Sequence, residues 1–190
     1  KMEKDKHKGI KVAESLVNPA GTKPTLSRIA VLSKAVQESQ SSYKRSSKAK
    51  AYLQSRNLNP NEIEVGYIGA ELGKSWNPQL QQSAAELGIL KPTTNGTYQP
   101  QLKHHILFNL KNQKGQTVNL YGRNINEKAQ IHHRYLKGHH QGLYPSWPDS
   151  KTINLILTES IIDCATLGAQ EEIKQHYSLL ALYGTNGFTP

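Results

Sequence analysis

The stretch Ile153-Asn-Leu-Ile-Leu157 decides the fold class, because it is a compact apolar run of the kind that forms a strand buried on both faces, as parallel strands are. A second such run, Tyr177-Ser-Leu-Leu-Ala-Leu182, follows a segment from about Ile161 to Gln175 that predicts a helix. Strand, helix and strand in this order form one βαβ unit. We therefore expect a parallel sheet with a right-handed crossover in this part of the chain.

The sequence upstream of this unit predicts helices first and strands later. Apolar residues recur at helical spacing after a possible cap at Thr25 or Ser27, and Gly88 ends the last predicted helix. The expected helices cover residues 26–36, 47–56 and 78–87, with a short helical turn at 61–65. The expected strands cover residues 66–69, 104–110 and 116–121, and a loop that ends at Gly115 joins the last two into a hairpin.

These elements give an α/β fold class with three parts. Residues 1–46 form a basic helical or linker arm, and residues 47–150 form a basic α+β subdomain with a mixed or antiparallel sheet. Residues 151–190 form the start of a parallel-sheet subdomain.

Composition excludes several classes of protein. The 190 residues are 36% hydrophobic and contain no apolar run long enough to span a membrane, so we expect no membrane partner. We expect no secretory signal. Cys164 is the one cysteine, which rules out an internal disulfide and a cysteine-based zinc site. We expect a protein of the reducing bacterial cytoplasm.

The charge is strongly positive and unevenly distributed. The net charge is +10, and residues 1–50 hold 12 Lys and Arg against 4 Asp and Glu. Such an excess favours a polyanionic partner such as nucleic acid. A solvated linker that is basic for solubility is an equally good interpretation of the first 50 residues.

Two carboxylates follow the first apolar run. Glu159 stands where this strand should end, which is where ligands bind in open α/β sheets, and Asp163 lies four residues later on the first helical turn. Both can face one crevice, and paired carboxylates suit Mg²⁺ or Mn²⁺, hard ions that also bind substrate phosphates. Alternatively, the pair only complements the dipole at the start of the helix.

The stretch Leu157-Thr-Glu-Ser-Ile-Ile-Asp-Cys-Ala-Thr-Leu167 resembles the TOPRIM motif of DnaG-type bacterial primases, and Leu182-Tyr-Gly-Thr185 resembles the turn after the second TOPRIM strand. The resemblance implies that Glu159 is catalytic and that Asp163 helps to shape a magnesium site. A TOPRIM site also needs an Asp-x-Asp pair after a third strand, which the sequence beyond Thr185 does not supply. We therefore expect either a longer parent protein or a domain without catalysis.

The resemblance extends upstream over roughly residues 50–190. Matching segments occur in the order of the primase core: Ala51-Tyr-Leu-Gln-Ser-Arg-Asn-Leu58, Ile106-Leu-Phe-Asn-Leu110, Tyr121-Gly-Arg123 and Arg134-Tyr-Leu136. In that family these segments line a basic groove for single-stranded template and incoming nucleotide. The residues that the resemblance places there are Arg123 as a phosphate contact, Arg134 as a groove cation, Tyr135 as a base-positioning residue, and Lys137, Lys103 and His105 as further contacts.

The sequence also departs from the family. Lys103-His104-His105 stands where the family has Arg-x-Arg, so the charge there should depend on pH. Six of the eight histidines occur as adjacent pairs, whose side chains point to opposite faces of a strand, so we expect no zinc within this chain. These departures favour a divergent primase, from a mobile element.

The resemblance implies DNA primase activity in a full-length parent: magnesium-dependent synthesis of RNA primers on single-stranded DNA from ribonucleoside triphosphates, with a replicative helicase as a further partner. Two alternatives stay open. One is a module that only binds single-stranded nucleic acid and keeps the TOPRIM half for structure, and the other is a TOPRIM nuclease or topoisomerase.

Overall fold

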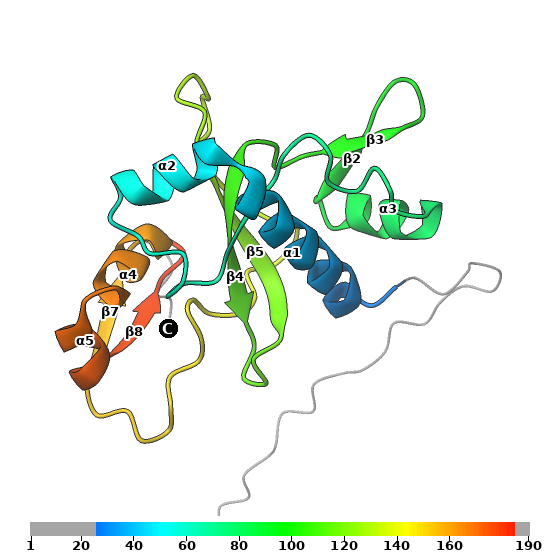
Figure 1. Cartoon of the computed structure of the whole chain (residues 1–190). Coiled ribbons are helices and arrows are strands. Elements are labelled where there is room, and N and C mark those ends of the chain that lie inside the picture. The colour runs from blue at the N-terminus through cyan, green and yellow to red at the C-terminus, as the bar shows by residue number, and fades with distance from the viewer. Residues whose placement is uncertain (1–25, 185–190) are drawn as a thin grey trace, which may run out of the picture.

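The computed structural model describes residues 26–184 and arranges them in three groups along one axis (Figure 1). An antiparallel sheet lies in the middle, a small parallel sheet with two helices lies at one end, and a helix with a short hairpin lies at the other. The helices are α1 (Arg28–Arg45), α2 (Ser47–Ser55), α3 (Pro78–Glu86), α4 (Ile161–Gly168) and α5 (Glu171–His176). The strands are β1 (Val65–Tyr67), β2 (Leu90–Pro92), β3 (Tyr98–Pro100), β4 (His105–Lys111), β5 (Thr117–Asn124), β6 (His133–Tyr135), β7 (Leu155–Thr158) and β8 (Ser178–Ala181).

The central sheet has the order β1-β4-β5-β6 with antiparallel pairing throughout. Its strand β4 is buried from His105 to Leu110, because apolar groups cover both faces. Leu107 packs on one face with α1, whereas Ile106 and Phe108 pack on the other face with residues of α2, α4 and β8. The predicted hairpin of β4 and β5 is confirmed, and Gly115 in its loop has a positive φ of 73° that few other residues tolerate.

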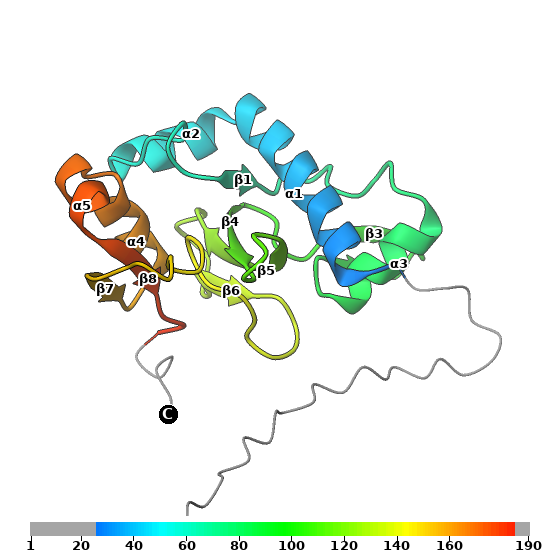
Figure 2. The same ribbon diagram turned by 90° about the horizontal axis from the view of Figure 1, so that it is seen from below.

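Helix α1 lies across the central sheet, as Figures 1 and 2 both show. Ser27 caps it by accepting a hydrogen bond from the backbone N–H of Ala30 at 3.3 Å. The helix approaches β1 so closely at Gly66 that a Cβ atom there would lie 2.0 Å from Ser39 Oγ. Only one residue, Ser46, separates α1 from α2, so the boundary that we expected at residue 46 falls between two consecutive helices.

The small sheet confirms the predicted parallel pair, with Leu155 opposite Ser178 and Thr158 opposite Ala181. The single helix that we expected from Ile161 to Gln175 is wrong, because α4 ends at Gly168 and α5 begins at Glu171. Glycine has a low helix propensity, and a Cβ at Gly168 would lie 3.3 Å from Leu179 Cδ1. The end of α4 is thus packed closely on β8.

The expectation that the first apolar run is buried on both faces is also wrong. The side chains of Leu155 and Leu157 are 45% and 43% exposed, and Ile153 is 93% exposed. Helices α4 and α5 cover one face of the pair, and within residues 26–184 no element covers the other. An apolar strand face is therefore left open to solvent.

The segment that follows β6 connects the two sheets. Leu143 forms an antiparallel bridge with Lys111 at the end of β4, and Tyr144 forms one with Ala181 in β8. Tyr144 also packs edge-on against Phe108, with ring centroids 5.6 Å apart. One hydrophobic cluster consequently extends from the central sheet into α4 and β8.

Candidate nucleic-acid interface

The pairing of β5 with β6 brings Arg123 opposite His133 and Tyr121 opposite Tyr135. Because directly opposite residues and alternate residues of a strand share a face, these four side chains project from the same face of the central sheet. Strand β6 is the edge of that sheet. His133 is exposed and Arg123 and Tyr135 are partly buried, whereas Tyr121 is buried within a hydrophobic cluster.

The guanidinium of Arg123 is held in place by its neighbour. Its Nη1 lies 2.6 Å from Nε2 of His133, and Nδ1 of the same ring lies 2.5 Å from the hydroxyl of Tyr121. Tyr121 is buried, and burial raises the pKa of its phenol well above the ordinary value. Burial also lowers the pKa of His133, and the adjacent charge of Arg123 lowers it further. The ring is accordingly neutral near pH 7.

A row of aromatic rings continues from this edge toward the small sheet. The ring centroids of Tyr121 and Tyr135 are 5.1 Å apart, and those of Tyr135 and Tyr183 are 5.0 Å apart. The ring of His140 lies 4.3 Å from that of Tyr183 and is tilted by 47° to it. The hydroxyl of Tyr183 donates to the backbone carbonyl of Gly142. Burial raises the pKa of Tyr135 to about 12. These phenols stay protonated and neutral near pH 7.

The row ends next to the predicted acidic pair. The backbone N–H of Gly184, the residue after Tyr183, donates to the carbonyl oxygen of Glu159 at 3.3 Å. Glu159 follows directly after the last residue of β7, and its side chain is exposed. The structure thus brings the loop of Glu159 and the edge of Arg123 to the two ends of one continuous aromatic row.

Asp163 lies on the first turn of α4 and takes part in a helix cap. Its backbone N–H donates to Ser160 Oγ at 3.1 Å, and Ser160 Oγ donates to Asp163 Oδ2 at 2.7 Å. This reciprocal arrangement stabilises the start of the helix. Asp163 therefore has a structural role in the cap of α4, while its carboxylate remains exposed and can accept further hydrogen bonds.

The two carboxylates are of the type that a hard divalent cation prefers. Mg²⁺ commonly takes one or two protein carboxylates together with waters and substrate phosphates. Among residues 26–184, no group of three or more histidine, cysteine, aspartate and glutamate side chains is arranged to hold a metal ion. Glu159 and Asp163 would therefore supply part of a magnesium site, with its other ligands coming from elsewhere.

The remaining predicted contacts are distributed over more than one surface. Arg134 lies opposite Gly122 and so projects from the other face of the sheet than Arg123. His105 is only 2% exposed, and its Nδ1 donates to the carbonyl of Lys103 at 2.9 Å. Its ring is therefore not accessible to nucleic acid in this structure. Lys103 and Lys137 are exposed, as the prediction requires of them.

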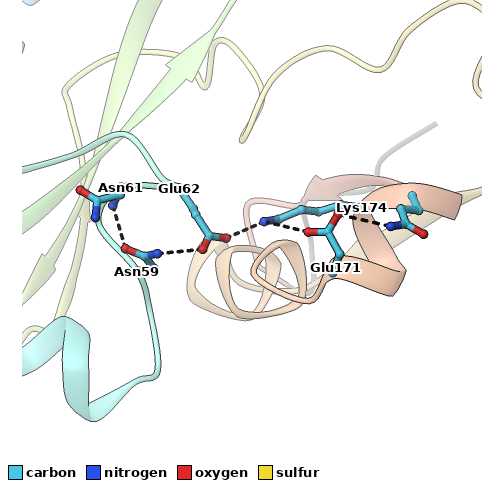
Figure 3. Close-up of polar contacts among 6 residues, drawn as sticks. Asn59, Asn61, Glu62, Glu171 and Lys174 are labelled. Atoms are coloured by element: carbon cyan, nitrogen blue, oxygen red, sulfur yellow. Dashed lines mark hydrogen bonds and ion pairs between the residues drawn. The ribbon is translucent and has the colours of Figure 1, made fainter.

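A polar contact between distant parts of the chain stabilises the small sheet against the rest of the molecule (Figure 3). Lys174 on α5 lies 2.5 Å from Glu62, which also accepts from Asn59 at 2.8 Å, and the same lysine lies 3.8 Å from Glu171. Hydrogen bonding to Lys174 lowers the pKa of Glu62. The contact joins the loop before β1 to α5.

Three residues of this interface were absent from the sequence-based prediction. His133, Tyr121 and Tyr183 each contact a predicted residue or the segment that holds one. The pattern Tyr121-Gly-Arg123 places two residues on one strand face and was a usable signal. His133 and Tyr183 join them only through strand register and chain folding, which have no local signature.

Comparisons with known proteins identify a matching family. The family model described as the DNA primase catalytic core, N-terminal domain, matches residues 36–145. A sequence search of curated proteins gave no match. Among helices of residues 26–184, none has the length and apolar character needed to cross a membrane.

Solved structures resemble the fold. The DnaG primase catalytic domain bound to single-stranded DNA aligns with a TM-score of 0.69 at 19% identity, covering 83% of this chain and 56% of that one. The Escherichia coli primase catalytic core gives 0.69 and 19%, covering 84% and 55%. The Aquifex aeolicus primase with its zinc-binding and RNA polymerase domains gives 0.69 and 17%, covering 81% and 41%.

The chain thus spans about half the length of the primase cores that it resembles, and it shares their mixed α/β fold. The family model covers more than half of the chain. This chain therefore belongs to the family of the DNA primase catalytic core, N-terminal domain.

Proposed function

We propose that this chain is part of a DNA primase that synthesises RNA primers on single-stranded DNA by metal-dependent nucleotidyl transfer. The proposal includes ribonucleoside triphosphates as substrates, a replicative helicase as a partner and the bacterial cytoplasm as the location. The observation that supports it most is the aromatic row, which joins Arg123 at a cationic sheet edge to the loop of Glu159. A polymerase of this kind needs both a template surface and a carboxylate centre, and needs them adjacent.

The edge of the central sheet is chemically suited to a single strand. Arg123 presents a planar guanidinium, which pairs well with phosphate oxygens. Two rings at the end of the row, the exposed His140 and the partly buried Tyr183, offer faces on which a base can stack. A solved primase catalytic domain with the same fold carries single-stranded DNA, which supports the same ligand class here.

Glu159 and Asp163 are the residues that would hold magnesium in this proposal. A cation bound there neutralises triphosphate charge and helps to align the attacking hydroxyl of the growing primer. The chain's own contribution is positional: the hydrogen bond from Gly184 fixes the backbone of Glu159, and the Ser160 cap fixes Asp163. The remaining acidic ligands would come from an Asp-x-Asp pair in a longer parent.

The uncovered face of β7 supports such a parent. Leu155 and Leu157 present apolar side chains at the surface, and apolar strand faces are normally covered by another element. The solved cores are nearly twice as long as the matched region. We propose that further TOPRIM strands and helices of the parent lie against this face.

A second candidate function is a binding module without catalysis. The participation of Asp163 in the cap of α4 favours it, because that carboxylate already has a structural role. The two proposals share Arg123 and the aromatic row. They differ in whether the Glu159 carboxylate is needed for any activity.

The test is template-dependent primer synthesis by the full-length protein with Glu159→Gln. We expect synthesis to fall by at least about a hundredfold, since a metal-binding carboxylate is lost, while affinity for a single-stranded oligonucleotide stays unchanged. Glu172→Gln, an equally exposed glutamate on α5, is the matched control and should leave both unchanged. Unchanged synthesis in Glu159→Gln contradicts the catalytic proposal and favours the binding module.

A further inference from the structure

The contact between Arg123 and His133 restricts the protonation of the imidazole. A guanidinium offers only N–H donors, so His133 Nε2, 2.6 Å from Arg123 Nη1, must accept. An accepting nitrogen carries no proton, so a neutral ring has its proton on Nδ1. That nitrogen lies 2.5 Å from the Tyr121 hydroxyl and donates to it.

The surroundings favour this neutral form. The rings of Tyr121 and His133 are tilted by 38° with centroids 5.9 Å apart, and the phenol is protonated because burial raises its pKa. The charged or titratable groups near the imidazole are Arg123 on β5 and the two sequence neighbours of His133, His132 and Arg134. Within the described part of the chain, no carboxylate forms a hydrogen bond or ion pair with His133 that would favour the imidazolium.

Two side chains restrain the guanidinium of Arg123: the imidazole of His133 and the hydroxyl of Tyr121. The Nε of Arg123 is buried without a hydrogen-bond partner among residues 26–184, and the two strands that carry Arg123 and His133 are paired at this position. A long, flexible side chain loses rotamer entropy when it binds a phosphate, and an acceptor that holds it beforehand lowers that cost. The imidazole accepts from Nη1 of Arg123 and, unlike the phenol of Tyr121, can lose this capacity by taking up a proton near neutral pH.

We infer that His133 is a positioning residue for Arg123: in its Nδ1-protonated neutral form it holds the guanidinium for contact with a phosphate of single-stranded nucleic acid, and protonation of the ring releases it. The inference rests on the proposed function, because it assigns Arg123 to a phosphate. It adds a residue that acts through Arg123 without touching the ligand. It also makes this contact sensitive to pH, since an imidazolium has two donors and no acceptor.

The first test needs no ligand. Long-range ¹H–¹⁵N spectra of the histidine rings, assigned by comparison with His133→Gln, report which nitrogen carries the proton. At pH 7.5 we expect His133 to show a protonated Nδ1 and an unprotonated Nε2. The opposite tautomer, or an imidazolium at that pH, overturns the inference and leaves the proposed function intact.

The second test is a double-mutant cycle on the affinity for a twelve-nucleotide oligodeoxythymidylate. Arg123→Gln should weaken binding about tenfold in the wild-type background, and about threefold or less in His133→Ala. His133→Gln, whose Oε1 can accept from the guanidinium, should preserve the full effect of Arg123→Gln. A general structural defect in His133→Ala would weaken binding without altering the ratio that Arg123→Gln measures.

The third test measures how the loss of affinity caused by Arg123→Gln depends on pH in each His133 background. Between pH 7.5 and 5.5 at constant ionic strength, the effect of Arg123→Gln should shrink in the wild-type background and stay constant in His133→Gln. An effect that is equal in the His133 backgrounds and independent of pH overturns the inference alone. An Arg123→Gln variant that binds like wild type in every background overturns both the inference and the proposed nucleic-acid surface.

Discussion

The central sheet and the small parallel sheet differ in how their apolar residues are covered. Strand β4 has a hydrophobic cluster on each face and is buried from His105 to Leu110. Strand β7 is equally apolar in sequence, yet Leu155 and Leu157 are nearly half exposed. Similar apolar runs are thus covered to different extents. Within the described residues the central sheet has packing partners on both faces, whereas the small sheet has them on one face only.

The two sheets also differ in what attaches them. The central sheet has a hydrophobic cluster on each face. The small sheet shares one of these clusters through α4 and Ala181, and it is also attached by the bridge from Tyr144 to Ala181 and the contact from Lys174 to Glu62. We therefore expect the small unit to open more readily than the central sheet.

Truncation of Phe108 should produce the largest loss of stability. Phe108→Ala removes a fully buried ring that packs against Tyr121 and Tyr144, and such changes cost about 3–5 kcal/mol in the free energy of unfolding. Urea unfolding measures this directly. Leu157→Ala in the small sheet is the matched comparison and should cost under about 1 kcal/mol, because its side chain is already 43% exposed. Equal losses would refute the difference in coverage.

An added methyl group should be tolerated differently at Gly66, in β1 of the central sheet, and at Gly168, at the end of α4 next to the small sheet. Gly66→Ala places Cβ 2.7 Å from Ser39 Cβ, which belongs to the body of α1 and cannot rotate away, so we expect a loss of about 1–3 kcal/mol. Gly168→Ala meets only the flexible end of Leu179 at 3.3 Å and should be neutral, or stabilising by up to about 1 kcal/mol through helix propensity. Thermal and urea unfolding check both. Rescue of Gly66→Ala by Ser39→Gly would confirm the source of the loss.

Acid should weaken the central sheet through His105. Burial lowers the pKa of His105, so the folded state binds fewer protons than the unfolded chain below pH 6.5. Stability is complete above the unfolded pKa and falls as the pH decreases toward the folded one, by at most about 1.4 kcal/mol per pH unit for this group. His105→Asn, whose amide can donate to Lys103 as the ring does, should show a shallower decline between pH 7 and 5 in urea unfolding. An unchanged slope would exclude His105 as the cause.

Removal of the contact between the two parts should have the smallest effect. Lys174→Gln and Glu62→Gln each break an exposed ion pair, and such pairs contribute little and are screened by salt. We expect faster amide exchange in α5 and β8 at low salt, with no change in β4 and β5. The control is Lys74→Gln, which breaks the exposed pair with Glu71 away from the small sheet. Faster exchange throughout the protein would show that the two sheets open together.

Much of the fold could be predicted from local patterns. The hairpin of β4 and β5, the parallel pairing of β7 with β8 and the ends of α2 follow from apolar periodicity and from residues such as Gly115. The break between α4 and α5 was not predicted, although Gly168, a residue of low helix propensity, ends α4. The hairpin of β2 and β3 was also missed, since each strand has only three residues and ends in proline.

The candidate site was predictable in kind rather than in arrangement. Arg123 and Glu159 stand in recognisable motifs; Arg123 lies near the end of β5, and Glu159 follows directly after β7. Whether a residue faces the same side as Arg123 depends on register, which separated Arg134 from it and brought His133 to it. The burial of His105 is likewise a tertiary effect, because nothing in its own neighbourhood of sequence distinguishes it from His104.

The most direct test of the account is amide chemical-shift mapping of the chain during titration with a twelve-nucleotide oligodeoxythymidylate. The account predicts that the perturbed residues form one continuous surface, from Arg123 and His133 through Tyr135 and Tyr183 to Glu159. Perturbations confined to α1 or to the β2–β3 hairpin, with this surface unaffected, would contradict it.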